Sequence, residues 1–152
     1  MESFVFQISK YPLFGKVKPA SDDPFMRTYS DFWIDVKEEE YKYVIQSLND
    51  NLAPKGGITV DVDAGTITVE NKEAYFESNL RDVKLLVEKM TTKDISNNSH
   101  VLGQIRKALN DIFSFRAYLG DSYNRVMSFD DFVRYAQNGA TYYIGHISTY
   151  HA

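Results

Sequence analysis

Residues 58–70 constrain the fold more than any other part of the chain, because apolar and polar residues alternate along them on both sides of a short turn. Strict alternation is typical of a β-strand with one buried face. The apolar positions are Ile58, Val60 and Val62 before Ala64-Gly65, and Ile67 and Val69 after it. A two-residue loop at Ala64-Gly65 pairs Val62 with Ile67 and Val60 with Val69. We therefore predict a β-hairpin in this register, with one apolar face and one solvated face.

Three further segments are predicted as strands from their alternation or from their β-branched and aromatic composition. They are residues 2–8, 31–36 and 140–149. In residues 31–36, the side chains of Phe32, Ile34 and Val36 are expected to face the core. The segment 9–30 contains three of the four prolines and is expected to be irregular.

Apolar residues at helical spacing predict four helices. The first follows Val36 and ends before Pro54, and the others span residues 72–90, 100–118 and 128–137. Asn71 and Ser128 are the predicted N-caps of the second and fourth helices. The stripe of the second helix is expected to face the core, and it consists of Phe76, Leu80, Val83, Val87 and Met90. The second and third helices are expected to form an antiparallel pair.

The resulting order of elements, β-β-α-β-β-α-α-α-β, indicates an α+β fold. We expect a small, mostly antiparallel sheet with the helices packed on one face. A length of 152 residues is typical of one domain, so residues 1–152 are predicted to form a single domain.

Several classes of function lack the residues that they need. The chain has no cysteine, which excludes disulfides and thiolate chemistry. It contains no G-x-S-x-G, no P-loop and no G-x-G-x-x-G motif, so no cofactor is expected. The absence of a basic stripe makes nucleic acid an unlikely partner. No apolar run approaches the roughly 18 residues of a membrane span, and no signal peptide is evident. We therefore expect a cytoplasmic protein with no membrane partner.

Carboxylates on the polar face of the hairpin are the residues closest to a metal-binding pattern. Asp61, Asp63 and Glu70 share this face, and hard cations such as Mg²⁺ prefer carboxylate ligands. An ordinary solvated sheet face explains the same pattern, and no distant segment supplies a further ligand. No metal site is therefore predicted.

The residues predicted to bind a partner combine acidic and aromatic side chains. Acidic residues outnumber basic ones by 21 to 17, and the strongest local bias is the run from Glu38 to Glu40. Trp33, the only tryptophan, shares a strand face with Asp31 and Asp35, and tryptophan is a frequent interface anchor. The alternative is that the loop 9–30 folds over Trp33 and buries it. The predicted contact residues are Trp33, Asp31, Asp35, Glu38, Glu39, Tyr142 and Tyr143.

These observations favour a small acidic protein that acts by binding another protein, one with a basic surface. An inhibitor, of the kind found among immunity and anti-defence proteins, fits this size and charge, and a homo-oligomer is compatible with it. The alternative is a ligand-binding or hydrolytic domain, with a pocket between the loop 9–30 and the sheet, that uses His146 with Tyr142 or Asp61. A third hypothesis is a nucleic-acid mimic, whose carboxylates imitate phosphates.

Overall fold

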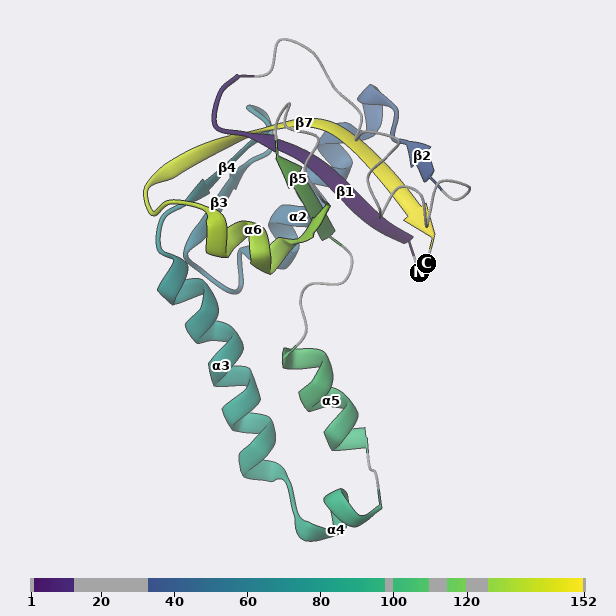
Figure 1. Ribbon diagram of the computed structural model, residues 1–152, viewed down its shortest axis with the longest axis vertical. Helices are drawn as coiled ribbons and strands as arrows, with labels where there is room; N and C mark the ends of the chain where they lie inside the picture. The colour runs from purple at the N-terminus through teal and green to yellow at the C-terminus, as the bar shows by residue number, and fades with distance from the viewer. Residues whose placement is uncertain (1, 13–32, 98–99, 110–114, 120–125, 152) are drawn as a thin grey trace.

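The computed structural model describes residues 2–12, 33–97, 100–109, 115–119 and 126–151, and these form an α+β fold. Figure 1 shows two parts, which we call the body and the arm. The body consists of the sheet with the helices that cover it. The arm consists of three helices that extend away from the sheet.

Seven strands form one sheet in the described part of the chain. They are β1 (Glu2–Ser9), β2 (Trp33–Asp35), β3 (Ile58–Asp61), β4 (Thr66–Val69), β5 (Phe115–Leu119), β6 (Met127–Ser128) and β7 (Ala140–His151). The order is β3-β4-β7-β1-β5-β6, and β2 also pairs with β7. Only the pairing of β1 with β5 is parallel among these strands. The predicted class, a mostly antiparallel α+β sheet, is therefore confirmed, although the order of elements differs in detail.

The helices divide between the body and the arm. The body contains the 3-10 turn η2 (Glu38–Glu40), α2 (Tyr41–Leu52) and α6 (Phe129–Tyr135). The arm contains α3 (Lys72–Lys89), α4 (Thr92–Ser96) and α5 (His100–Leu109). Asn71 and Ser128 cap α3 and α6 as predicted, since their side chains accept hydrogen bonds from the backbone N–H groups of Ala74 and Asp131.

The hydrophobic core lies between one face of the sheet and the two body helices. Apolar side chains of α2, α6 and the inner sheet face form one continuous buried cluster. Its largest members that are fully buried include Phe6, Phe129, Phe132, Tyr75 and Tyr142. The helices of the body thus cover one sheet face, as the sequence predicts, whereas those of the arm do not.

The arm is an antiparallel pair of helices, α3 and α5, joined through the short helix α4 at its tip (Figure 1). The pairing is the predicted one, but of the stripe expected to face the core it is Phe76 that packs against the core cluster, and the stripe further along α3 does not follow the prediction. Leu80 and Val87 are 51% and 48% exposed. In the described part of the chain the first turns of α3 contact the body, where the Tyr75 hydroxyl donates a hydrogen bond of 2.7 Å to the buried carboxylate of Asp130.

The register of the predicted hairpin is wrong by two residues. Val60 pairs with Ile67 and Ile58 with Val69, so the loop between the strands has four residues rather than two. Gly65 adopts a φ of 64°, and the Asp61 carboxylate accepts a hydrogen bond from the N–H of Ala64, which closes the wider turn. A shift of two residues keeps every side chain on its original face, which is why alternation alone does not detect it.

Two other predictions need correction. Residues 115–118 were expected at the end of a helix but belong to β5, which pairs with β1. The helix α5 ends at Leu109, and residues 110–114 lie outside the described part. Ile34 was expected in the core but is 57% exposed, because β2 is a short strand on the side of β7 away from β1.

Candidate functional site: a buried histidine cluster behind an acidic turn

Of the residues that the sequence grouped as a partner surface, Asp35, Glu38 and Glu39 lie at one exposed turn, whereas Tyr142 is buried. Asp31 lies outside the described residues, as do residues 13–30 of the loop 9–30 that was considered as a cover for Trp33. Trp33 forms the first position of β2, opposite Tyr150, and its side chain lies outside the described part. Glu38 and Glu39 are exposed in η2.

The two tyrosines of the predicted surface have different environments. Tyr142 is fully buried in the core, and its hydroxyl accepts a hydrogen bond of 2.9 Å from the N–H of Gln137. A side chain held in this way is not available to a partner, so Tyr142 does not belong to the surface. Tyr143 is half-buried on the neighbouring position of β7.

An irregularity in β7 places His146 at the centre of the sheet. Phe6 of β1 pairs with Ile147, but Ile8 pairs with Ile144, so β7 has one extra residue between them. Such bulges re-aim side chains and often occur beside functional sites. Here Ile144 and Ile147 both contact the core, and the backbone N–H of His146 donates to the amide oxygen of Gln7 at 3.0 Å.

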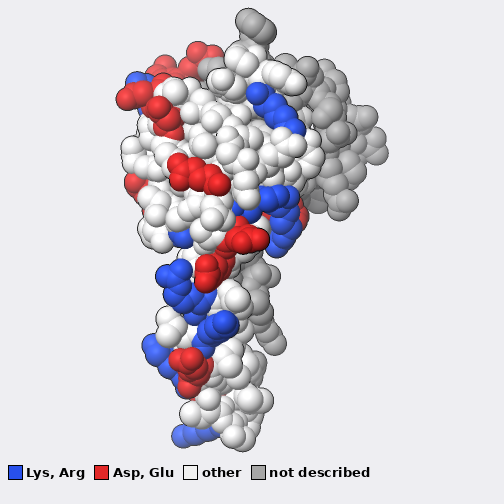
Figure 2. All heavy atoms as spheres, turned by 90° about the vertical axis from the view of Figure 1, so that its left-hand side faces the viewer, with Lys and Arg blue, Asp and Glu red and all other residues white. Residues whose placement is uncertain are grey.

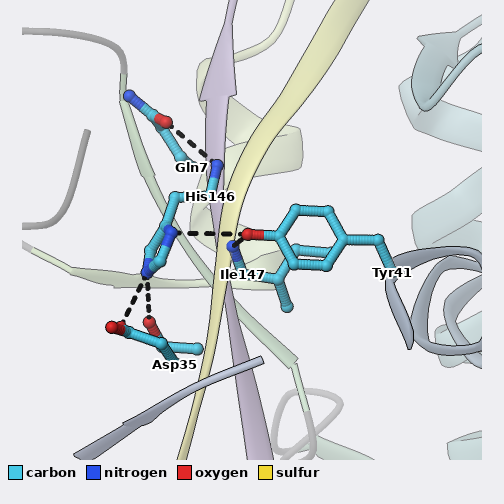
Figure 3. Close-up of polar contacts among 6 residues, drawn as sticks. Gln7, Asp35, Tyr41, His146 and Ile147 are labelled. Carbon is cyan, nitrogen blue, oxygen red and sulfur yellow. Dashed lines mark hydrogen bonds and ion pairs between the residues drawn. The ribbon is translucent and has the colours of Figure 1, made fainter. Parts of the chain in front are cut away.

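The imidazole of His146 joins a cluster of polar groups (Figure 3). Its Nε2 lies 3.0 Å from a carboxylate oxygen of Asp35 and 2.9 Å from the hydroxyl of Ser148. Its Nδ1 faces the hydroxyl of Tyr41 at 3.4 Å. The side chain of His146 is 8% exposed and that of Asp35 is 41% exposed, so the cluster extends from the interior to the surface.

Tyr41 fills a gap in the sheet. On one side of β7, residues 140–143 pair with β4 and residues 148–150 pair with β2, and neither strand reaches the residues between them. The N–H of Ile147 lies in this gap and donates to the Tyr41 hydroxyl at 3.2 Å. When the Tyr41 proton points at Nδ1, the neutral imidazole carries its own proton on Nε2, facing Asp35. In that tautomer Nδ1 accepts from Tyr41, and the single Nε2–H is shared between the Asp35 carboxylate and the Ser148 hydroxyl.

This geometry differs from that of a catalytic relay. In a Ser-His-Asp relay the serine and the carboxylate contact different nitrogens of the imidazole. Here Ser148 and Asp35 contact the same nitrogen, and Tyr41 faces the other. Both ring nitrogens thus already have partners within the protein, which is the usual condition of a buried structural histidine.

A buried tyrosine lies close to the same cluster. Burial raises the pKa of Tyr118, and the nearby Tyr41 and Asp35 raise this pKa further because a phenolate there would lie beside two other acidic groups. The phenol of Tyr118 therefore stays neutral. Gln7, the Cα partner of Tyr118 across β1 and β5, is fully buried as well.

The cluster fixes both ends of the acidic turn that contains η2. Asp35 is at the end of β2, immediately before the turn, and Tyr41 is at the start of α2, immediately after it. The N–H of Val36 also donates to the carbonyl oxygen of Ile147 at 3.0 Å. Three exposed glutamates, Glu38–Glu40, therefore lie on a short turn whose two ends are bonded to the same part of β7.

The hairpin carboxylates have partners of their own. Asp63 forms an exposed ion pair with Lys42 at 2.7 Å, and this hydrogen bond lowers the pKa of Asp63 and raises that of Lys42. Glu70 accepts a hydrogen bond from the hydroxyl of Thr59. Within the described ranges, no three His, Asp or Glu side chains lie close enough to bind a metal ion.

From the sequence, Asp35 was predicted to contact a partner protein, whereas His146 was predicted as the central residue of the alternative ligand-binding or hydrolytic site. They are 111 positions apart, and no local pattern links them. The alternative paired His146 with Tyr142 or Asp61, whereas the structure pairs it with Tyr41 and Asp35. The buried Gln7 carries the clearest signal that was missed, because it is an uncharged polar residue within an apolar strand.

No helix in the described part of the chain is both long enough and apolar enough to cross a membrane. No protein-family model matches the chain, and the comparisons with curated proteins and with solved structures found no match either. The proposals below therefore depend on the chain's own geometry.

Proposed function

We propose that the protein acts by binding another protein, and that the turn containing η2 is the centre of its contact surface. The observation that carries this proposal is the fixed geometry of the turn. Three exposed glutamates lie between two anchors, Asp35 and Tyr41, that are both bonded to His146 or its neighbour Ile147. Holding a recognition loop in one conformation reduces the entropy lost on binding.

Apolar side chains beside the turn support the same proposal. Ile34 precedes the turn and is 57% exposed, and Tyr43 follows it and is 78% exposed. Tyrosine is enriched at protein interfaces because its ring covers a large area and loses little entropy. We call Ile34, Glu38, Glu39 and Tyr43 the acidic edge. Its charge favours a partner with a basic surface, and such complementarity accelerates association.

Hydrolysis at His146, the alternative function, has less support from the geometry. A general base needs a ring nitrogen directed at its substrate. Both nitrogens of His146 contact protein groups, and the ring is 8% exposed. Protein binding is therefore the function that we propose.

Site-specific photo-crosslinking tests the proposal. A photoreactive amino acid replaces Tyr43 in cells of the source organism, and the covalent adducts are identified by mass spectrometry. We expect one dominant adduct, whose yield falls severalfold when Glu38 and Glu39 are both changed to Gln, because two charged contacts are lost. The fold should persist, since each glutamate contributes at most ~1 kcal/mol at a helix start.

A second double variant provides the matched control. Glu77→Gln with Glu88→Gln removes the same charge from exposed positions of α3. This control should leave the adduct at Tyr43 unchanged. Equal loss in both double variants, or no adduct at all, would contradict the proposed contact surface.

A further inference from the structure

The arm has a hollow of about 760 Å³ between α3 and α5, and one wall of this hollow has a distinctive order of side chains. The wall that α3 provides contains Asp82, Leu85, Leu86 and Lys89. Residues three, four and seven apart share one face of a helix. From the body toward the tip, the wall therefore consists of an acid, two leucines and a base.

The floor of the hollow is apolar and open to solvent. Leu85 is 50% exposed, and Leu86 is half-buried. Apolar surface that is rimmed by charged residues is characteristic of protein interaction sites. Figure 2 shows acidic and basic side chains interspersed along the arm, with uncharged surface between them.

The opposite wall includes a glycine in the interior of a helix. Gly103 lies in α5, and glycine is the poorest helix former after proline. A Cβ atom added at Gly103 would meet no atom within 4 Å. Packing against the described residues therefore does not require glycine there, whereas the bare backbone lets another helix approach closely.

We propose that this hollow receives the same face of a second copy of the chain, with the two α3 helices antiparallel. A twofold axis then passes between Leu85 and Leu86. Asp82 and Lys89 are about 10 Å apart along the helix and equidistant from that axis. Each Asp82 consequently faces Lys89 of the second copy, and the leucines of the two copies meet between these pairs.

The order of charges selects this arrangement. A twofold contact uses the same surface on both copies, so the surface must be complementary to itself. An antiparallel pairing satisfies this condition because the acid and the base exchange places. A parallel pairing would place Asp82 against Asp82 and Lys89 against Lys89. The contact uses the arm alone, so it does not depend on the acidic edge.

Charge reversal on the full chain tests the proposal. Sedimentation velocity over a concentration series should show a reversible dimer of the unmodified protein. Asp82→Lys and Lys89→Asp, made separately, each turn two attractions into two repulsions, and each should weaken the dimer by about tenfold or more. Both positions are exposed, so each variant should keep the circular dichroism spectrum of the unmodified protein.

Restoration of the dimer gives the decisive result. An equimolar mixture of the two single variants should form a heterodimer, because the reversed charge of each chain then faces the reversed, opposite charge of the other, and the two unreversed charges face each other. A chain with both reversals should again dimerise with itself. Lys84→Asp is the matched control, since Lys84 lies about 140° around the helix from Lys89 and should leave the dimer unaffected.

Three results would overturn the proposal. They are a monomer at every concentration, a dimer that neither reversal weakens, and a weakened dimer that neither the mixture nor the double variant restores. A monomer whose arm binds a helix of a different protein would assign the hollow to that partner instead. Failure of the acidic-edge experiment would leave all of these results unchanged, so the two proposals are tested separately.

Discussion

The helix α2 of the body and the helix α3 of the arm have similar apolar stripes, but only the first is covered. In α2 the stripe is buried, with Val44, Ile45, Leu48 and Leu52 all at 4% exposure or less. In α3 the positions Leu80 and Val87 are about half exposed. Periodicity thus identifies the apolar face of a helix, whereas the position of the helix in the fold determines what covers that face. The stripe lies on a different face of α3 from the wall formed by Asp82, Leu85, Leu86 and Lys89, so the proposed dimer does not cover it.

The largest contrast between the two regions should appear when one leucine is shortened in each. Leu48 is fully buried in the core, so Leu48→Ala should reduce the free energy of unfolding by about 2–5 kcal/mol. Leu80→Ala makes the same chemical change in the arm and should cost less than about 1 kcal/mol, since half of its surface is already in water. Urea denaturation of both variants measures the difference, and equal losses would show that the arm is as tightly packed as the body.

Local signals in the sequence predicted the elements better than they predicted the contacts between them. Caps at Asn71 and Ser128 are short-range hydrogen bonds and were found correctly. The strand β5 was missed because its partner β1 is more than 100 residues away, and residues 115–119 alone are compatible with a helix. The His146 cluster combines residues from both ends of the chain, so no spacing rule could assemble it.

The hydrogen bond between Tyr75 and Asp130 connects the two regions, and its removal should have the next largest effect. Tyr75→Phe deletes a hydroxyl that donates to a carboxylate 6% exposed in α6. Hydrogen bonds to charged groups contribute about 1.5–3 kcal/mol, and the variant should lose a similar amount of stability. Hydrogen exchange should also show faster opening of the first turns of α3. Unchanged exchange there would mean that the arm is held by its other contacts, such as the bond from the Lys72 N–H to Asn138.

A similar loss within the body should follow when the bond from Ile147 to Tyr41 is broken. Tyr41→Phe leaves the N–H of Ile147 without its partner in the gap of the sheet, which should cost about 1–3 kcal/mol. Tyr43→Phe provides the control two residues further on, because Tyr43 is 78% exposed. Its effect should stay within about 0.5 kcal/mol. Thermal unfolding of the two variants tests the claim that Tyr41 anchors the acidic turn, and equal melting temperatures would refute it.

The smallest expected effect has the opposite sign and lies in the arm. Gly103→Ala should raise the stability of the monomer by about 0.5–1 kcal/mol, because alanine favours the helix and its Cβ would enter open space. Denaturation at a protein concentration below the dimerisation range measures this gain. The same substitution adds a methyl group to the hollow, where a close approach of the second copy leaves little room. We therefore expect the dimer to weaken while the monomer becomes more stable. If both quantities rise together, the glycine is not at the contact, and the axis of the proposed dimer must pass through another part of α3.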